Sequence, residues 1–335
     1  MLNKDLHVLR GLLEVSGATP AMSATRDGFG KALLELGEKD ERVVVLCADL
    51  AESTRVLAFK EKFPERYIEL GVAEQNLATV ASGLANYGKI PFTASYATFS
   101  PGRNNEQIRT TISINNVPVK IAGMHAGVSV GPDGATHQAL EDIALMRVQP
   151  NMVVISPCDA EEAYKATFAA AATNTPVYLR FAREKTPVMT TMQTPFHIGK
   201  ANLMWQPVPG KKAEVALFAT GPLLYNALLA AQDLEKDIAV SVYNIHTIKP
   251  LDEGTIIDAA KNAGAVVTVE EHQIAGGLGS AIAELLAQHA PVPMEFVGVH
   301  DQFGQSGKPE ELIEHYGMGM QAIMESITRA KKRKR

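Results

Sequence analysis

The pattern of hydrophobic and polar positions divides the chain into short and long segments that alternate. Short runs of β-branched and other apolar residues predict strands, and longer segments with an apolar residue every three or four positions predict helices. This alternation is typical of an α/β fold in which each domain has a mainly parallel β-sheet covered by helices. In the first half of the chain, strands are expected at residues 42–48, 90–95, 117–124, 151–156 and 176–181, and helices at residues 73–88, 104–116, 137–148 and 159–174.

Between residues 184 and 212 the periodicity disappears, and prolines occur at positions 187, 195, 207 and 209. These features predict a linker, which we place at residues 191–211. A length of 335 residues also suits two domains, and we expect them at residues 15–190 and 212–330. In the second domain, strands are expected at residues 213–220, 238–245, 265–272 and 294–300, and helices at residues 221–236, 252–264 and 276–290.

The composition is that of an ordinary globular protein, with 46% hydrophobic residues and a net charge of −5. This net charge gives no sign of a basic surface that could bind nucleic acid. The basic run at residues 331–335 is expected to be a solvated tail. No segment approaches the roughly twenty apolar residues of a membrane span. We therefore expect neither nucleic acid nor a membrane as a partner. For residues 6–15, a helix lying on a partner and a frayed extension both remain open.

Two cysteines, Cys47 and Cys158, occur in apolar surroundings. Neither has a second cysteine or a histidine at metal-ligand spacing. They are expected to be buried, reduced thiols in a cytoplasmic protein.

Glu74 stands where a helix with an apolar face should begin, in the stretch ELGVAEQN. The helix dipole favours a carboxylate in the first turn by about 0.3–1 kcal/mol, which is a sufficient reason for its presence. Small residues later in the helix, such as Ala78, Ala81 and Gly83, would however allow close packing and bury this first turn. A buried carboxylate needs a partner, and a ligand is the second interpretation.

Other candidate site residues follow the predicted strands, where ligands bind in open α/β sheets. They are Asp49 and Ser53 after the first strand, Phe99 and Arg103 after the second, and His125, Asp133 and His137 after the third.

The last three of these belong to the glycine-rich segment HAGVSVGPDGATHQALED, the densest polar cluster in the chain. Histidine has a free pKa of about 6.5 and suits proton transfer near neutrality, which favours a site that handles a polyol or a carbonyl. A structural loop with incidental histidines and a metal site are the alternatives. We assign no metal ligands, because the spacing of a glycine-rich loop does not fix three ligands on one ion.

Three arginines have comparable positions: Arg26 precedes an expected helix, and Arg180 and Arg183 follow a strand in YLRFAR. Each alone is more often a surface ion-pair partner. Together with Ser53 they could hold a sugar phosphate through bidentate hydrogen bonds. The glycines of EEHQIAGGLGSA lack the spacing of a nucleotide-binding loop and predict a tight strand-to-helix turn.

The motifs ELGVAEQN, GPDGATHQALED, YLRFAR and VTVEEHQIAGGLGSA, taken together, resemble the C-terminal half of a transketolase in the form encoded as a separate subunit. The resemblance extends from about residue 24 to residue 320 and places the chain in the thiamine-diphosphate-dependent superfamily. It implies that residues 15–190 hold the aminopyrimidine ring of the cofactor. Residues 212–330 would be the C-terminal domain, which has no direct catalytic part.

The resemblance also implies roles for individual residues. Glu74 would hydrogen-bond the pyrimidine nitrogen and promote loss of the thiazolium proton, as a catalytic residue together with His125 and His137. Asn105 departs from the family, which usually has an aromatic residue there. The remaining implied contacts are Phe99, Asp49 and Arg103 for the cofactor, His125, His137 and Asp133 for substrate hydroxyls and the oxyanion, and Arg26, Ser53 and Arg183 for the substrate phosphate, with Arg180 less definite.

The sequence has no Gly-Asp-Gly motif, through which this superfamily binds the diphosphate and its Mg²⁺ or Ca²⁺. The resemblance therefore implies an N-terminal-type partner subunit, self-association into a heterotetramer, and transfer of a two-carbon ketol unit between sugar phosphates in the pentose phosphate pathway. The enzymatic alternatives are a 2-oxoacid dehydrogenase beta subunit and 1-deoxyxylulose-5-phosphate synthase. A non-catalytic assembly subunit is the alternative of another class.

Overall fold

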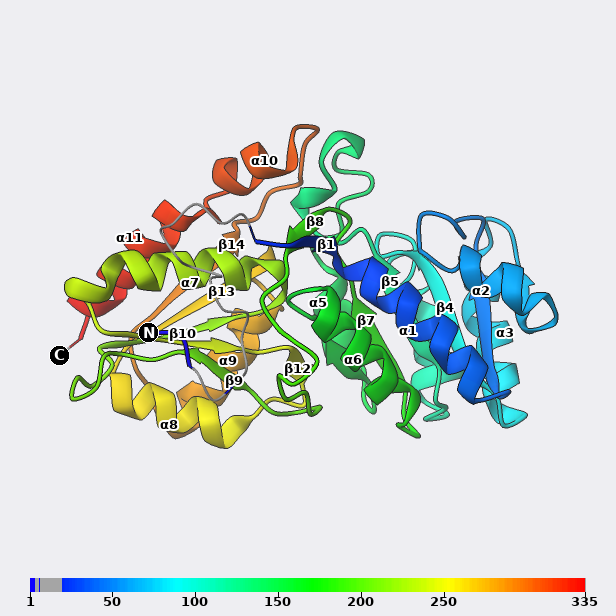
Figure 1. Ribbon diagram of the computed structural model, residues 1–335, viewed down its shortest axis with the longest axis horizontal. Coiled ribbons are helices and arrows are strands. Elements are labelled where there is room, and N and C mark those ends of the chain that lie inside the picture. Colours follow the sequence, from blue (N-terminus) through cyan, green and yellow to red (C-terminus); the bar gives the residue numbers. More distant parts are fainter. Residues whose placement is uncertain (4–5, 7–19, 335) are drawn as a thin grey trace.

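The computed structural model describes residues 1–3, 6 and 20–334. Two sheets lie side by side, each with helices on both faces, and the chain passes from one to the other in its middle (Figure 1). Apart from one antiparallel edge strand in each sheet, neighbouring strands are parallel. The predicted α/β fold with mainly parallel, helix-covered sheets is confirmed.

Among the described residues, the first sheet has seven strands in the order β12-β6-β7-β5-β4-β2-β3. Every residue of β2, β5 and β7 is buried, as expected for strands covered on both faces. β3 was not predicted because its three residues are too few for a periodic pattern. The strands are β2 (Val43–Cys47), β3 (Tyr67–Glu69), β4 (Ile90–Tyr96), β5 (Lys120–Met124), β6 (Val153–Ile155), β7 (Val177–Arg180) and β12 (Thr247–Lys249).

Helices cover this sheet in two groups that bury separate apolar clusters. On one face lie α1 (Thr25–Lys39), α2 (Leu57–Lys62) and α6 (Ala160–Ala171). On the other lie α3 (Glu74–Asn86) and a helix that starts as α4 (Asn105–Gln107) and continues as the π-helical turn η3 (Ile108–Ser113).

The helix expected at residues 137–148 begins only at Asp142, as α5 (Asp142–Arg147). The residues before it are held by the preceding loop instead. Ala139 forms a parallel bridge with Ala126, and Nε2 of Gln138 donates a hydrogen bond of 3.0 Å to the backbone carbonyl of Val128. These tertiary contacts outweigh the helical pattern of the sequence.

The second sheet has five strands in the described part of the chain, in the order β14-β13-β10-β11-β9. Its strands are β9 (Asn202–Trp205), β10 (Val215–Ala219), β11 (Val240–Asn244), β13 (Val266–Gln273) and β14 (Met294–Val299). Its helices are α7 (Leu224–Asp233) and α11 (Met320–Lys332) on one face, α8 (Glu253–Ala263) and α9 (Leu278–His289) on the other, and α10 (Pro309–His315) after β14.

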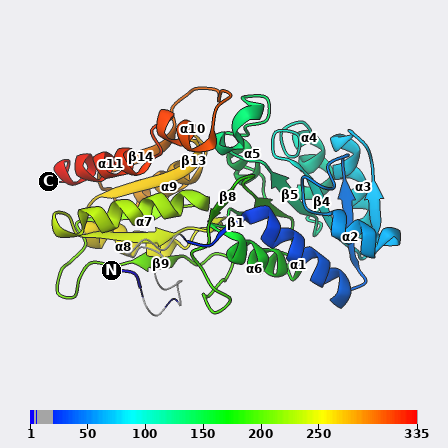
Figure 2. The same cartoon turned by 45° about the horizontal axis from the view of Figure 1, so that its top comes forward.

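Four short strands, β9, β12, β1 and β8, form antiparallel pairs near the segment between the domains. β9 lies inside the segment that the sequence predicted as a linker and pairs antiparallel with β11. β12 crosses back to the first sheet and pairs antiparallel with β6. β1 (Met22–Ala24) pairs with β8 (Lys185–Pro187) in a separate two-stranded sheet, seen at the centre of Figure 2. The segment between the domains is therefore packed against both of them.

The basic run at the C-terminus was expected to be a solvated tail, and Lys332, Arg333 and Lys334 are indeed exposed. The run nevertheless makes ion pairs and hydrogen bonds with the second domain. Nζ of Lys331 lies 2.8 Å from Oε1 of Glu214, and Nη1 of Arg333 lies 2.6 Å from Oε1 of Glu295. Lys334 donates to two backbone carbonyls. Glu214, just before β10, and Glu295, within β14, thus pair with the basic residues at the end of α11.

The remaining expectations concern the N-terminus, membranes and cysteines. Residues 6–15, for which two interpretations were open, lie outside the described residues apart from Leu6. No helix in the described part of the chain is both long and apolar enough to cross a membrane. Cys47 and Cys158 are free and buried, as predicted.

Candidate functional site

The carboxyl ends of β2, β4 and β5 meet at one edge of the first sheet, because these strands are adjacent and parallel. The residues that follow them, among them Phe99 and His125, therefore gather at this edge. Glu74 enters the same region from the first turn of α3, and Arg26 from the first turn of α1. Arg26 was expected to precede this helix, but the helix already begins at Thr25.

Glu74 is almost fully buried, with 1% of its side chain exposed. Its Oε2 accepts a hydrogen bond of 2.8 Å from Nη1 of Arg103. Its backbone carbonyl accepts one of 2.8 Å from Nδ2 of Asn104. Both sequence interpretations therefore describe part of the arrangement: the carboxylate lies at a helix N-terminus, and it is buried with a partner, which here is a cation of the same chain.

Arg103 also lies over an aromatic ring. Its guanidinium carbon is 4.8 Å from the centroid of the Phe99 ring, and 48% of its side chain is exposed. The ring of Tyr96 stacks against Phe99 with 5.8 Å between centroids. A planar, hydrogen-bonding cation thus lies in contact with both a buried carboxylate and an aromatic face.

His125 is buried and has a φ of 55°, a left-handed conformation that is rare outside glycine. Its ring centroid lies 3.9 Å from that of Tyr96, and its Nε2 lies 3.4 Å from Nη1 of Arg26. Arginine can only donate, so Nε2 must accept, and the proton of a neutral ring is then on Nδ1.

That Nδ1 is buried and has no hydrogen-bond partner among the described residues. Burial, with the positive charges of Arg26 and Arg183, lowers the pKa of His125 to about 3, so the ring is neutral near pH 7. A buried donor without an acceptor is rare and points to an oxygen atom supplied by a ligand.

His137 and Asp133 lie at the far end of the same loop. The His137 ring is edge-on to Phe99, with 5.4 Å between centroids, and 6.0 Å from Tyr96. Its Nδ1 is 2.9 Å from the hydroxyl of Thr136. The aromatic pair of Tyr96 and Phe99 therefore contacts both histidines, whereas Asp133 is exposed.

Two of the three arginines are near this group. Arg26 donates from Nη1 to the backbone carbonyl of Ser53 at 2.7 Å. Arg183 donates from Nη1 to the carbonyl of Val130 at 2.7 Å and forms an ion pair of 3.2 Å with Glu184. Both retain other N–H groups for an anion.

Arg180 is different, and its interpretation as a phosphate ligand is wrong. Its side chain is 5% exposed and forms an ion pair with Asp142, with 2.8 Å between Nε and Oδ2. Nη2 donates to the backbone carbonyl of Glu271 in the second domain at 2.8 Å. A guanidinium engaged in this way stabilises the packing of the domains and is not available to a substrate.

Asp49, predicted as a cofactor contact, lies in a turn with a φ of 58°, and its side chain is exposed. Its backbone N–H donates to Oε1 of Glu69 at 2.8 Å. The sequence did not single out Tyr96 or Arg55. The position of Tyr96 at the end of β4 could have indicated it; Arg55 pairs with Asp27 at 2.7 Å and adds positive charge near His125.

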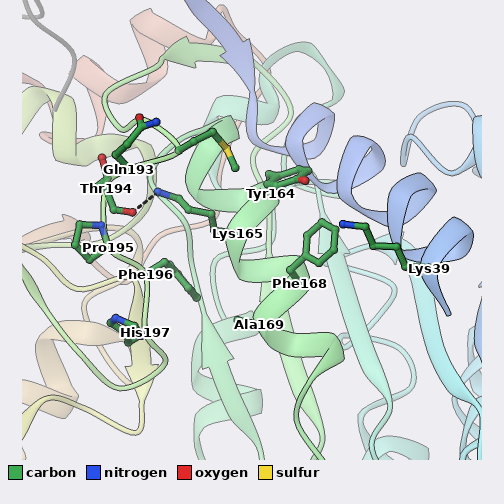
Figure 3. Close-up of a pocket in the computed structure, with 11 residues that line it drawn as sticks. Lys39, Tyr164, Lys165, Phe168, Ala169, Gln193, Thr194, Pro195, Phe196 and His197 are labelled. Carbon is green, nitrogen blue, oxygen red and sulfur yellow. Dashed lines mark hydrogen bonds between the residues drawn. The ribbon is translucent and has the colours of Figure 1, made fainter. Parts of the chain in front are cut away.

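No three histidine, cysteine, aspartate or glutamate side chains in the described ranges come together as a metal site. A surface pocket of about 430 Å³ lies elsewhere, between α6 and residues 192–197 (Figure 3). There Lys165 donates to the carbonyl of Thr194 at 2.8 Å. None of the predicted site residues lines this pocket.

Two family profiles match the chain: the pyrimidine binding domain of transketolase over residues 21–189, and the C-terminal domain of transketolase over residues 207–323. The chain belongs to the transketolase family. The resemblance recognised in the sequence is thereby confirmed.

Individual members of the transketolase family match nearly the whole chain. A protein of Methanocaldococcus jannaschii named as a transketolase C-terminal section is 41% identical, over 94% of this chain and 98% of that protein. The 6-deoxy-6-sulfo-D-fructose transketolase subunit of Clostridium sp. (strain MSTE9) is 38% identical, over 92% of this chain and 95% of that subunit. A solved structure titled "Split gene transketolase, inactive beta4 tetramer" is 42% identical, with a TM-score of 0.86, and the match covers 93% of this chain and 99% of that one. Over nearly its whole length the chain is thus similar to transketolase subunits of the split type.

Proposed function

We propose that this chain is the C-terminal-type subunit of a two-chain transketolase, which transfers a two-carbon ketol unit from a ketose phosphate to an aldose phosphate with thiamine diphosphate. The observation that carries the proposal is the buried Glu74 carboxylate beside the Phe99 ring. The guanidinium of Arg103 contacts both groups.

The residues present fit the aminopyrimidine ring of the cofactor. This ring is flat and carries an amino group and ring nitrogens, so it needs an aromatic face and a hydrogen-bonding carboxyl group. Phe99 and Glu74 are of these types, and the flat guanidinium of Arg103 already touches both. In the proposed complex Arg103 moves toward solvent, which its half-exposed side chain allows. Asp49 remains a proposed contact at the adjoining strand end.

When bound, thiamine diphosphate supplies the nucleophilic carbon that the chemistry requires. Glu74 would hydrogen-bond the pyrimidine nitrogen in a site where burial strengthens the interaction. His125 donates from its unpaired Nδ1 to the oxygen of the donor carbonyl, where negative charge develops. His137 and Asp133 orient substrate hydroxyl groups.

Arg26 and Arg183, with Ser53, are proposed to bind the anionic end of the sugar. Both guanidiniums have free N–H groups after their contacts to backbone carbonyls. Guanidinium binds tetrahedral oxyanions through paired hydrogen bonds, and a sulfonate has the same geometry as a phosphate. The Clostridium relative is named for a sulfonated sugar. Both kinds of donor should therefore be assayed: turnover of pentose phosphates would support a role in the pentose phosphate pathway, and turnover of the sulfonate alone would not.

The proposal includes an N-terminal-type subunit, which would hold the diphosphate and Mg²⁺ or Ca²⁺, in a heterotetramer. It is supported by the lack of a Gly-Asp-Gly motif in this sequence. It is also supported by the split-gene relative, whose assembly of one chain type is titled inactive.

The test is reconstitution with an N-terminal-type transketolase subunit, thiamine diphosphate and Mg²⁺, using fructose 6-phosphate as donor and ribose 5-phosphate as acceptor. We expect turnover by the pair and none by the lone chain. Glu74→Gln should lower kcat by about 10²-fold or more, the usual size of an acid–base contribution. The control Glu61→Gln, on the exposed side of α2, should keep full turnover.

Full activity of the lone chain would refute the partner requirement. If the pair containing Glu74→Gln turns over as fast as the wild-type pair, the result would favour the interpretation as a non-catalytic assembly subunit. Turnover of pyruvate in place of ketose phosphates would favour 1-deoxyxylulose-5-phosphate synthase or a 2-oxoacid dehydrogenase beta subunit.

A further inference from the structure

The loop that carries His125 and His137 has little conformational preference of its own. Besides His125, three of its glycines have a positive φ: Gly127 at 91°, Gly131 at 81° and Gly134 at 74°. Glycine loses more conformational freedom on ordering than any other residue. The positions of the two histidines therefore depend on what the loop packs against.

One of these contacts comes from Glu271 of β13, in the C-terminal domain. Its Oε1 accepts a hydrogen bond of 2.6 Å from the backbone N–H of Ser129. A Cβ atom added to Gly127 would lie 2.3 Å from the same oxygen, so the carboxyl group lies directly against the loop backbone. Glu271 is 4% exposed, so its side of this contact is largely shielded from solvent.

The segment between β14 and α10 makes a second set of contacts. Nε2 of Gln138 donates to the carbonyl of Val128 in the loop and to that of Gln305 in the C-terminal domain, each at 3.0 Å. A Cβ atom on Gly134 would lie 2.7 Å from Oγ of Ser306. Figures 1 and 2 both show α10 beside the loop, whose six residues from Val128 to Asp133 form the 3-10 segment η4.

Glu271 is held in place from its other side. Its backbone carbonyl accepts the Nη2 hydrogen bond of Arg180, which is fixed by Asp142. Burial raises the pKa of Glu271, although Arg180 and the N–H of Ser129 oppose this. The contact to Ser129 needs only an acceptor oxygen at the correct reach, so a neutral side chain of the same length can replace it.

We propose that Glu271 is a positioning residue: it fixes the loop that carries His125 and His137, and through it the C-terminal domain takes part in the reaction. This role rests on the proposed transketolase function, for which the resemblance gave the C-terminal domain no direct catalytic part. Glu271 does not touch the reacting atoms.

Three variants distinguish the effect of the length of the side chain at position 271 from the effect of its charge. Glu271→Asp keeps the charge but shortens the side chain by one methylene group, Glu271→Gln keeps the reach and an acceptor oxygen, and Glu271→Ala removes both. Asp258→Ala, on the exposed side of α8, is the matched control. Each is assayed as the reconstituted pair with fructose 6-phosphate and ribose 5-phosphate. Amide exchange of residues 125–137 is measured on the same proteins and on the lone chain.

We expect Glu271→Ala and Glu271→Asp to lower kcat on the order of tenfold, since small displacements of catalytic groups are costly. Donor KM should change little, and exchange in residues 125–137 should become faster. Glu271→Gln and the control should match the wild type in both readouts. If Glu271→Ala does not fold, the comparison of Glu271→Asp with Glu271→Gln tests the proposal.

The inference is overturned if Glu271→Gln is as impaired as Glu271→Asp, or if neither kcat nor exchange changes in Glu271→Asp. Failure of the proposed function would look different: the wild-type pair would not turn over ketose phosphates. The exchange rates would still report whether Glu271 holds the loop.

Discussion

Replacing Arg180 by methionine should destabilise the protein far more than replacing Arg183, although both belong to the motif YLRFAR. The side chains of Arg180 and Asp142 are 5% and 1% exposed, and Nε lies 2.8 Å from Oδ2. In the Arg180→Met variant Asp142 keeps the Tyr178 hydroxyl, which donates to its Oδ2 at 2.6 Å, but loses the one ion-pair partner that it has among the described residues.

The expected loss for Arg180→Met is about 3–5 kcal/mol, the usual cost of removing one partner of a buried ion pair. The Arg183 side chain is 30% exposed, and its ion pair with Glu184 faces solvent. For Arg183→Met we expect about 0–1 kcal/mol. This variant should instead raise KM for a phosphorylated donor in the reconstituted enzyme.

The difference in the free energy of unfolding between the wild type and Arg180→Met should depend on pH because of Asp142. Burial by itself would raise the pKa of this carboxyl group, but Arg180, with help from the Tyr178 hydroxyl, outweighs burial and the pKa is lowered. A carboxyl group with a lowered pKa in the folded protein adds stability above its unfolded pKa of about 3.9 and loses it as the pH falls through the folded value. The free energies of unfolding of Arg180→Met and of the wild type should therefore become more similar at acidic pH.

Urea titration followed by far-ultraviolet circular dichroism and by the fluorescence of Trp205, the single tryptophan, measures these free energies of unfolding. The two arginine variants serve as controls for each other. Should Arg180→Met unfold within about 1 kcal/mol of the wild type, below the range for a buried pair, and raise KM for phosphorylated donors, the structural role would be refuted and the phosphate role restored.

Two further changes test buried carboxyl groups. Burial and Asp159 raise the pKa of Glu162 to about 7, so its folded form retains a proton and stability should fall as the pH rises from about 4.5 toward 7. Glu162→Gln should abolish this fall in urea titrations at pH 5 and pH 8, since the amide can still accept from the N–H of Cys158; an unchanged slope would contradict it. Arg103→Ala leaves buried Glu74 without its cation and should lower the free energy of unfolding by about 1–3 kcal/mol. In the double variant Arg103→Ala/Glu74→Gln, thermal denaturation should show most of the lost stability regained. If the effects of the two substitutions on stability simply add, the two side chains are not coupled.

The sequence pattern predicted the long, buried strands well, because a β-branched run covered on both faces leaves few alternatives. It missed β1, β3, β8, β9 and β12, which have three or four residues each and depend on neighbours for their pairing. It also started the helix before Asp142 five residues too early. The competing bonds of that segment are to residues outside the local pattern.

For the site, the sequence indicated which residues follow strands but not which way they face. Arg180 ends strand β7 and Arg183 follows it, and the two look alike in the sequence, yet Arg180 is buried against Asp142 and Arg183 lies near His125. The pairing of Glu74 with Arg103 joins residues 29 positions apart and has no local signal. Tyr96, which contacts both histidines, was missed because its position at the end of β4 was its one signal, and the predicted strand stopped at residue 95.

The contacts between the domains explain why a domain without its own reacting groups can affect the site. Arg180 donates to Glu271, Glu271 accepts from Ser129, and Asn244 of β11 donates from Nδ2 to Oε1 of Glu162 at 2.8 Å. Separating the domains would break the two hydrogen bonds made by Glu271 and the one made by Asn244, at a net cost of about 0.5–1.5 kcal/mol apiece. Local opening of the loop is therefore coupled to opening of the domain interface. The histidines remain in position for as long as that interface is closed.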